Sequence, residues 1–268
     1  MELASWRLLA RTIKHADVVV EVLDIRDPIS THSRKLEAMV RAFDKSLLLV
    51  LNKSDLVPRR VAEKWRALYE DMGYDVVYVS ARSRLGTRIL RSAIKSTVDS
   101  KPFTAAVVGF PKTGKSSIIN VLKGRRSAST SPIPGSPGYT RHVQLYKVEP
   151  GFYLIDTPGV IPVEGGWLEA VIRGRSPEEL SDPVPAAIAL LERILRYNPR
   201  AVLKAYGIRS LEPLEILKEL AVRRGWFYKK TKEPLIEEAA RAVIRDYHKA
   251  KIPFYLPPEE ALKARTSP

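Results

Sequence analysis

The residues best suited to chemistry form a glycine-rich loop at positions 109–117, with the sequence GFPKTGKSS. Gly109, Gly114, Lys115 and Ser116 occupy the fixed positions of the phosphate-binding pattern G-x-x-x-x-G-K-[ST]. In such a loop, backbone N–H groups face phosphate oxygens and the following helix N-terminus adds positive partial charge. The Lys115 ammonium would reach the outer phosphates, and the Ser116 hydroxyl would bind Mg²⁺. We expect the rest of the loop to contact the same nucleotide: Pro111, Lys112, Thr113 and Ser117.

A second polar motif, Asn52-Lys53-Ser54-Asp55, directly follows an apolar run. The Asp55 carboxylate can accept hydrogen bonds from guanine N1–H and from the N2 amino group, and adenine offers neither donor. Asn52 would tether the loop that holds the base, and the alkyl stem of Lys53 would lie along the base. The motif therefore predicts guanine specificity.

Ser80-Ala81-Arg82 ends the next apolar run and suits a second contact with the base. The Ala81 N–H would lie near guanine O6.

Two further features suit the metal and the γ-phosphate. In Asp156-x-x-Gly159, the carboxylate would bind Mg²⁺ through a water, and the Gly159 N–H would turn toward a γ-phosphate. Thr140 lies in a segment rich in Ser, Thr, Pro, Gly and Arg, residues 124–142, and would supply a second hydroxyl to the metal. We therefore assign metal binding to Ser116, Thr140 and Asp156, and catalysis to Lys115, Thr140 and Gly159.

All of these motifs follow short apolar runs that are typical of buried strands. We expect strands at 18–23, 46–51, 74–79, 103–108, 143–148 and 152–155, and helices at 2–15, 33–43, 58–72, 86–98 and 116–123. Alternation of strands and helices predicts a mostly parallel sheet covered on both faces. The carboxyl ends of its strands would meet at the ligand-binding edge.

After residue 164 the pattern changes to helices alone. We expect them at 167–173, 184–197, 200–206, 213–224 and 234–250, followed by an extended tail over 251–258. The sequence therefore predicts two domains, residues 1–164 and 165–268.

Composition limits the class of protein. The 268 residues are 45% hydrophobic, carry a formal charge of +15 and include no cysteine. The absence of cysteine excludes disulfides, thiolate metal sites and a cysteine nucleophile, and it suits a reducing compartment. There is no apolar run long enough for a membrane span and no secretory signal, so we expect a cytoplasmic protein without a membrane partner. The positive charge favours a polyanionic partner.

Amide side chains are almost absent, and Lys, Arg and Glu are abundant. This pattern is typical of hyperthermophile proteins, so a thermophilic source is a hypothesis. A melting temperature in the mesophile range would remove it.

The order of the motifs is a rotated version of the usual GTPase order, because base recognition precedes the phosphate loop, Thr140 and Asp156-x-x-Gly159. This order resembles the circularly permuted GTPases of the YlqF/YawG type, which assist assembly of the large ribosomal subunit. The helical part is similar too, in its RRG at 223–225, its AAR at 239–241 and its RDYHKAKIPFYLPP at 245–258.

The resemblance implies an α/β fold, a circularly permuted Ras-like P-loop domain with a parallel-type sheet, followed by an all-α domain that binds RNA or ribosomes. It implies GTP/GDP and Mg²⁺ as ligands, and the large ribosomal subunit precursor and its rRNA as partners. We expect a monomer and no DNA partner.

Three positions bear on how this chain would use GTP. Val160 stands where ordinary GTPases use Gln to orient the attacking water, which predicts slow hydrolysis that a partner must raise. Some members of the family use an N-terminal His instead, but here that segment has only His15, without the family's motif. His142, near Thr140, is a weak substitute candidate or a surface residue of its loop. Lys112 stands where the family often carries an Asn associated with potassium use. The replacement puts potassium dependence in question: Lys112 either places its own ammonium near the phosphates or faces solvent.

Two stretches are candidates for RNA contact. Arg84, Arg88, Arg91 and Lys95 fall on one face of the helix after Arg82, at spacings of four, three and four, and this face is either an RNA surface or a solvated face. The run 223–232 interleaves basic and aromatic residues, which suits phosphate contacts beside stacking, although its aromatic residues fit a helical core equally well. Two other functions stay open: a GTP-gated RNA-binding scaffold in which hydrolysis is not required, and a metabolic or RNA-modifying enzyme. No constellation for a second substrate supports the enzyme.

Overall fold

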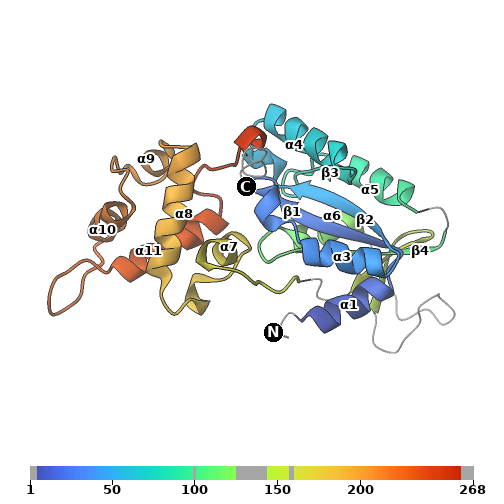
Figure 1. Cartoon of the computed structure of the whole chain (residues 1–268), viewed down its shortest axis with the longest axis horizontal. Coiled ribbons are helices and arrows are strands. Elements are labelled where there is room, and N and C mark those ends of the chain that lie inside the picture. Colours follow the sequence, from blue (N-terminus) through green and yellow to red (C-terminus); the bar gives the residue numbers. More distant parts are fainter. Residues whose placement is uncertain (1–4, 99–100, 125–143, 157–159, 261–268) are drawn as a thin grey trace. The chain divides into compact units, whose positions relative to one another are not determined.

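The computed structural model describes residues 5–98, 101–124, 144–156 and 160–260 (Figure 1). The chain divides into two compact units, residues 1–162 and 163–268.

The first unit is built on a six-stranded sheet with the order β3-β2-β1-β4-β6-β5. Its strands are β1 (Val18–Asp24), β2 (Ser46–Asn52), β3 (Asp75–Tyr78), β4 (Phe103–Val108), β5 (Gln144–Glu149) and β6 (Phe152–Asp156). The pairs β1–β2, β1–β4, β2–β3 and β4–β6 are parallel, and β5 alone runs antiparallel, against β6. The predicted mostly parallel sheet is confirmed, and β1 at its centre is buried along its whole length.

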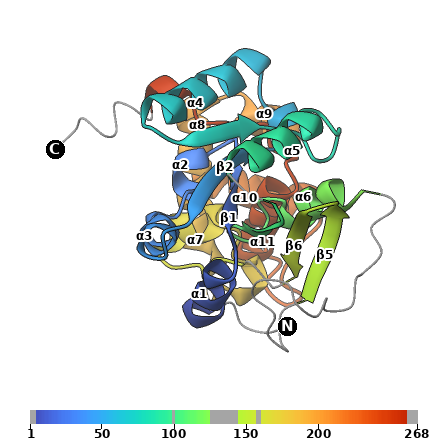
Figure 2. The same cartoon turned by 90° about the vertical axis from the view of Figure 1, so that its right-hand side faces the viewer.

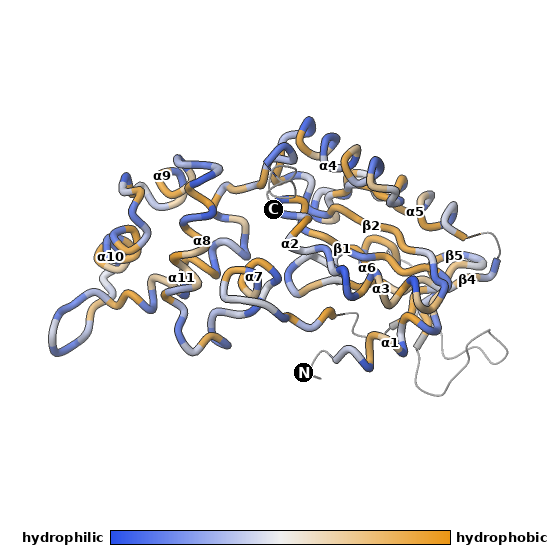
Figure 3. The backbone as a smooth tube through the Cα atoms, in the orientation of Figure 1, coloured by the Kyte–Doolittle hydropathy of each residue, from blue (hydrophilic) through white to orange (hydrophobic). Residues whose placement is uncertain are grey.

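Helices cover both faces of this sheet: α1 (Trp6–Lys14), α3 (Arg34–Ala42), α4 (Arg59–Asp71), α5 (Thr87–Ser96) and α6 (Lys115–Lys123). Helices α1 and α3 lie on one side, and α5 and α6 lie on the other (Figure 2). Val18, Val20 and Val22 of β1 belong to the same buried cluster as Leu90 of α5 and Ile118 of α6. A strand buried on both faces must be apolar at successive positions, and β1 and β2 are hydrophobic along most of their length (Figure 3).

The sequence did not predict two short elements beside the ligand edge, α2 (Pro28–Thr31) and the single 3₁₀ turn η1 (Ser54–Leu56). The Asp27 carboxylate accepts from the Ser30 N–H at 3.2 Å, and Pro28 occupies the first turn, so α2 has an N-cap and an initiating proline. At four residues, α2 is too short to give a periodic apolar pattern.

The second unit contains α7 (Trp167–Ile172), η2 (Pro177–Glu179), α8 (Pro183–Tyr197), α9 (Ala201–Tyr206), α10 (Pro213–Arg223) and α11 (Ile236–His248). Helix α8 packs against α7, α10 and α11. Its Leu190, Leu191 and Ile194 lie in one buried cluster that also contains Ile252 and Phe254 of the extended tail. The predicted all-α character of this part is confirmed.

Candidate functional site

The phosphate loop connects β4 to α6 and depends on two glycines. Gly109 has φ +151°, and a Cβ there would lie 2.6 Å from the Val22 carbonyl oxygen of the neighbouring strand. Gly114 has φ +100°, and a Cβ there would lie 2.2 Å from Nδ2 of Asn52. A side chain at either position would therefore meet both backbone strain and a close contact.

Asn52 joins three loops. Its side chain is buried, its Nδ2 donates to the Thr113 carbonyl at 2.9 Å, and its Oδ1 accepts from the Ala81 N–H at 3.1 Å. The loop after β2, the phosphate loop after β4 and the loop after β3 therefore share one amide group. The Ala81 N–H, which we expected near guanine O6, donates to Asn52 in this structure.

The Asp55 carboxylate lies at the surface beside these loops. Ser80 is fully buried and its Oγ donates to Asp55 Oδ1 at 2.5 Å, while the Ser83 N–H donates to Ser80 Oγ at 3.1 Å. A buried hydroxyl therefore orients an exposed carboxylate, as two hydrogen bonds to a base would require. Arg82 is exposed on the same loop.

An ion cluster beneath the base-recognition loop was missed in the sequence. The Lys53 ammonium donates to Asp24 Oδ2 at 2.6 Å, and Arg26 donates to the same carboxylate through Nη2 at 2.7 Å and Nε at 3.1 Å. Burial by itself would raise the pKa of Asp24, but Arg26 and Lys53 outweigh burial and hold this pKa well below its usual range. Burial also lowers the pKa of Lys53, and Asp24 opposes that effect.

The cluster fixes Lys53, whose backbone has φ +66°. The sequence shows that Asp24 ends an apolar run, but its place beside Asn52 follows from the register of β1 against β2, which the sequence does not show. An Asp at that edge of the sheet is adjacent to the guanine motif.

In the phosphate loop, the Lys115 ammonium donates to the Phe110 carbonyl at 2.8 Å, and burial lowers the pKa of Lys115 to about 8. Ser116 and Ser117 are exposed in the first turn of α6. The remaining loop residues differ in exposure. Thr113 is buried, and its Oγ1 donates to the Phe110 carbonyl at 2.9 Å. Pro111 is half-buried, and Lys112 is exposed with φ +62°.

The metal and γ-phosphate residues are described only in part. Asp156 ends β6, which pairs with β4, so the backbone at Asp156 and the phosphate loop leave the same edge of the sheet. The Asp156 side chain, Thr140, His142 and Gly159 lie outside the described residues. Just beyond them, Val160 bridges to Gly109, and the Ile161 N–H donates to the Gly109 carbonyl at 3.0 Å.

No group of three or more His, Cys, Asp or Glu side chains that could hold a metal occurs among the described residues. Mg²⁺ at a phosphate loop does not need such a group, because it keeps several waters and binds phosphates with one or two protein oxygens. The exposed Ser116 hydroxyl on the first turn of α6 fits that requirement.

The two candidate RNA surfaces have different outcomes. Arg84 and Arg88 are exposed, but Arg84 precedes α5 and has φ +55°, so its predicted place on the helix face is wrong. Arg91 instead donates to the carbonyls of Val121 and Leu122 at the end of α6, at 2.9 and 2.6 Å, and Lys95 forms an ion pair with Glu149. The predicted four-residue face therefore has two members engaged in holding α5 to neighbouring elements.

The basic-aromatic run forms a turn between α10 and α11 with a hydrophilic tip (Figure 3). Arg223 pairs with Glu219 and Arg224 with Asp246, and Trp226 packs partly against the helical core. Every residue of the run except Trp226 is exposed; the exposed residues without an ion pair described above include Phe227, Tyr228, Lys229, Lys230 and Lys232.

Across the described ranges, no helix has the length and apolarity needed to cross a bilayer.

Comparison with known proteins agrees with this geometry. A family model described as RsgA GTPase matches residues 8–164. An uncharacterized GTP-binding protein of Methanocaldococcus jannaschii is 34% identical over 93% of this chain and 66% of its own length. Nucleolar GTP-binding protein 2 of Neurospora crassa is 30% identical, over 97% of this chain and 43% of its own. The guanine nucleotide-binding protein-like NSN1 of Arabidopsis thaliana is 33% identical, over 96% and 49%. The chain thus spans between about two fifths and two thirds of the lengths of these relatives.

Solved structures are similar over almost the whole chain. A GDP-bound YlqF has a TM-score of 0.68 at 24% identity, covering 91% of this chain and 96% of that protein. A GNP-bound YlqF from T. maritima has a TM-score of 0.63 at 23% identity, covering 94% and 97%. The fold predicted from the rotated order of motifs is therefore confirmed, and the chain belongs to the RsgA GTPase family, with the circularly permuted architecture of YlqF.

Proposed function

We propose that the protein binds and hydrolyses GTP and acts as a switch in assembly of the large ribosomal subunit. The observation that carries the GTP part is the Asn52 amide, which joins the phosphate loop to both base-recognition loops. A single side chain thereby sets the spacing between the phosphate and base contacts of one nucleotide. The oriented Asp55 carboxylate supports guanine as the base, because guanine alone offers it two donors.

Each residue of the site has a part in this proposal. Lys115 neutralises charge on the outer phosphates, and the N–H groups of the loop at 109–117 hold their oxygens. Lys53, held by Asp24, lies along the base. Ser116, Thr140 and Asp156 would hold Mg²⁺, which neutralises charge that develops on the phosphates. The Gly159 N–H would contact the γ-phosphate.

Slow intrinsic hydrolysis is part of the proposal. The aliphatic side chain of Val160 can neither accept a proton from the attacking water nor orient it. The reference scale is the Ras-like rate of roughly 10⁻⁴ per second, and a partner must supply the rest. Equal rates in Na⁺ and K⁺ would support the Lys112 ammonium as the local cation, and strong K⁺ stimulation would contradict it.

The ribosomal part of the proposal rests on three supports. They are the resemblance to the YlqF/YawG type, the nucleolar name of the Neurospora crassa relative and the formal charge of +15, which suits an RNA partner. Within the helical unit, the exposed Lys229 and Lys230 beside Phe227 and Tyr228 suit contact with phosphates and bases. We propose a cytoplasmic monomer that docks on a large-subunit precursor in the GTP state and leaves after hydrolysis.

The test is GTP turnover with and without purified large ribosomal subunits, with ATP as the control nucleotide. We expect slow turnover alone, strong stimulation by subunits and no stimulated turnover with ATP. Asp55→Ala should lose the preference for GTP, whereas Asp71→Ala, at an exposed carboxylate on α4, should behave as the wild type. Nucleotide-dependent subunit binding without stimulated turnover would instead favour the GTP-gated scaffold. Absence of GTP binding would refute the proposal.

A further inference from the structure

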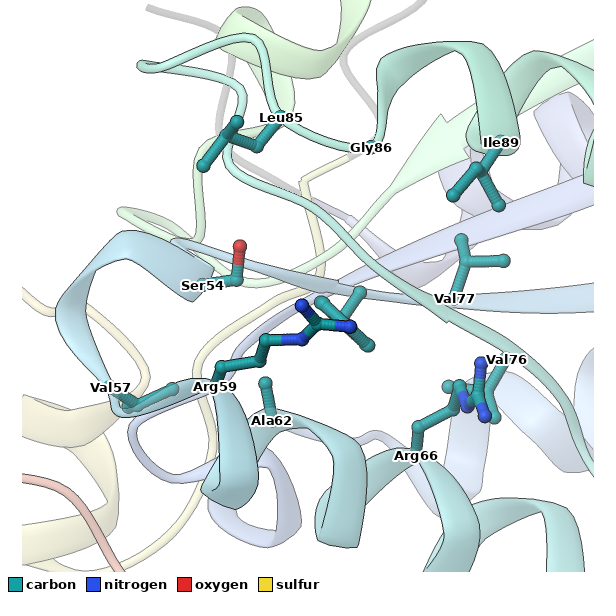
Figure 4. A pocket seen from close by; sticks show the side chains of 11 residues that line it. Ser54, Val57, Arg59, Ala62, Arg66, Val76, Val77, Leu85, Gly86 and Ile89 are labelled. Carbon is teal, nitrogen blue, oxygen red and sulfur yellow. The ribbon is translucent and has the colours of Figure 1, made fainter.

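A pocket of about 420 Å³ lies at the edge of the sheet behind the base-recognition loop (Figure 4). Its floor is β3, which is the last strand in the sheet order, so one side of β3 has no strand neighbour among the described residues. Arg59 and Arg66 of α4 form one wall, and Leu85 and Ile89, before and within α5, form the other (Figure 4). The volume lies within the range of known ligand-binding pockets.

The walls of this edge groove combine exposed apolar and positively charged groups. Leu85 is 59% exposed and Ile89 is 63% exposed, which is unusual for large aliphatic side chains at neighbouring positions. No carboxylate lines the groove. Arg59 pairs with Glu63 and Arg66 with Glu70, but both are exposed pairs within one helix, a type that contributes little to stability. Carboxylates of a partner could replace these glutamates at small cost.

The chemistry of the groove favours a protein segment over a nucleic acid. Bases bind by stacking on aromatic or guanidinium planes, and the groove offers Arg59, Arg66 and Tyr78 for that. Its most exposed apolar side chains, Leu85 and Ile89, are aliphatic and offer a base no plane to stack on. An extended segment that alternates aliphatic and acidic residues would bury its aliphatic side chains against Leu85 and Ile89. Its carboxylates would face Arg59 and Arg66.

The groove is connected to the base-recognition carboxylate. The backbone groups of Leu85 and Ser80 exchange two hydrogen bonds, each of 3.1 Å, and Ser80 Oγ donates to Asp55. Ser54, the neighbour of Asp55, lines the same groove. A partner that buries Leu85 gains contacts that exist only while Leu85 is held against Ser80, so it stabilises the arrangement that orients Asp55.

We propose that the edge groove docks an extended acidic-aliphatic segment of a protein partner, and that docking slows release of guanine nucleotide through Leu85, Ser80 and Asp55. The docking part stands by itself, and the coupling rests on the proposed GTP binding.

Docking is tested by fluorescence anisotropy with a fluorescein-labelled octapeptide of alternating valine and glutamate. We expect saturable binding to the full chain, none with the valine-lysine analogue and none with an oligouridylate. Leu85→Ser with Ile89→Ser should abolish binding, whereas Leu211→Ser, a comparably exposed leucine in the helical unit, should not. Equal binding of the lysine peptide, preferential binding of the oligouridylate or binding that survives the double substitution would overturn the proposal.

The charge contribution has its own matched pair of variants on α4. Arg59→Gln with Arg66→Gln should weaken peptide binding, whereas Arg60→Gln with Lys64→Gln should not, because the second pair is exposed on the same helix but does not line the groove. Equal effects of the two double variants would contradict docking in this groove.

The coupling is tested by release of a fluorescent GDP analogue with and without saturating valine-glutamate peptide. We expect release to slow by about fivefold or more, and the peptide to bind GDP-loaded protein more tightly by the same factor that it increases GDP affinity. Unchanged release with bound peptide would overturn the coupling. Failure of GDP to bind at all would refute the proposed function instead, and the anisotropy measurement would still decide on docking.

Discussion

Asp24→Asn tests whether the ion cluster below the base-recognition loop positions Lys53. The substitution keeps the shape of the side chain but removes the charge that Arg26 and Lys53 share. The side chains of Asp24, Arg26 and Lys53 are 8%, 3% and 19% exposed, so two buried cations would lose their counterion. Removing one member of a buried ion pair costs about 3–5 kcal/mol, and we expect a loss of that order in the free energy of unfolding.

The effect of Asp24→Asn on nucleotide affinity should be smaller than its effect on the free energy of unfolding, and it can be measured separately. Without Asp24 the Lys53 side chain must be ordered when nucleotide binds, which costs about 0.5–1.5 kcal/mol for one flexible side chain. We therefore expect the GDP dissociation constant to rise about 2- to 12-fold, since 1.4 kcal/mol corresponds to a factor of ten.

The measurements are thermal unfolding and GDP titration at a temperature where every variant is folded. Asp246→Asn is the matched control, because Asp246 is an equally buried carboxylate held by Arg224 at 3.2 Å and Lys251 at 3.1 Å in the helical unit. It should lower stability without changing GDP affinity.

A double-mutant cycle gives the refuting result. If Asp24 acts through Lys53, then Asp24→Asn added to Lys53→Ala should cause no further loss of GDP affinity. Additive losses, or an unchanged affinity in Asp24→Asn alone, would refute the positioning role.

Three other predictions concern the phosphate loop and the helical unit. The pKa of Lys115 is about 8 without nucleotide, and bound phosphates favour the charged ammonium. GDP affinity should therefore be constant below about pH 8 and fall as pH rises above it, and GDP binding near that pH should take up protons. Calorimetry in two buffers measures both, and an affinity that stays constant to high pH would contradict the prediction. Gly114→Ala should abolish nucleotide binding and lower the free energy of unfolding by more than about 1 kcal/mol, because the new Cβ would lie 2.2 Å from Nδ2 of Asn52. Gly73→Ala controls for backbone strain alone, because Gly73 has φ +84° and open space around it. Lys229→Gln with Lys230→Gln should weaken binding to rRNA of any sequence and reduce the slope of log affinity against log salt concentration by about two. Filter binding at several salt concentrations measures the slope, and an unchanged slope would place the RNA surface elsewhere.

The sequence was sufficient for the architecture and the main motifs, for a physical reason. A strand buried on both faces is apolar at most positions, and a phosphate loop needs glycines at fixed places, so β1, β4 and the loop after β4 can be read locally. Gly109 illustrates this, since the Val22 carbonyl leaves no room for a side chain.

Contacts between distant residues could not be read in the same way. The pair of Asp24 and Lys53 depends on the register of β1 against β2, and no spacing within either segment reveals it. Helical spacing grouped Arg91 with Arg88 correctly, but it could not show that Arg91 donates to carbonyls at the end of α6. Periodicity reports which face of a helix a residue occupies and not what lies opposite.

The position of β1 between β2 and β4 has a consequence for how the protein is made. β2 follows β1 closely in the chain, but β4, the partner on the other side of β1, is synthesised much later. For example, Asp17, just before β1, accepts a hydrogen bond from Thr104 of β4, which lies 87 positions further on. At about 5–20 residues per second, a translating ribosome leaves that edge of β1 without its partner for about 4–17 s. During this interval the nascent chain carries a mostly apolar strand with one unpaired edge, so chaperones that bind such edges should associate with chains stalled before β4 and leave those stalled after it.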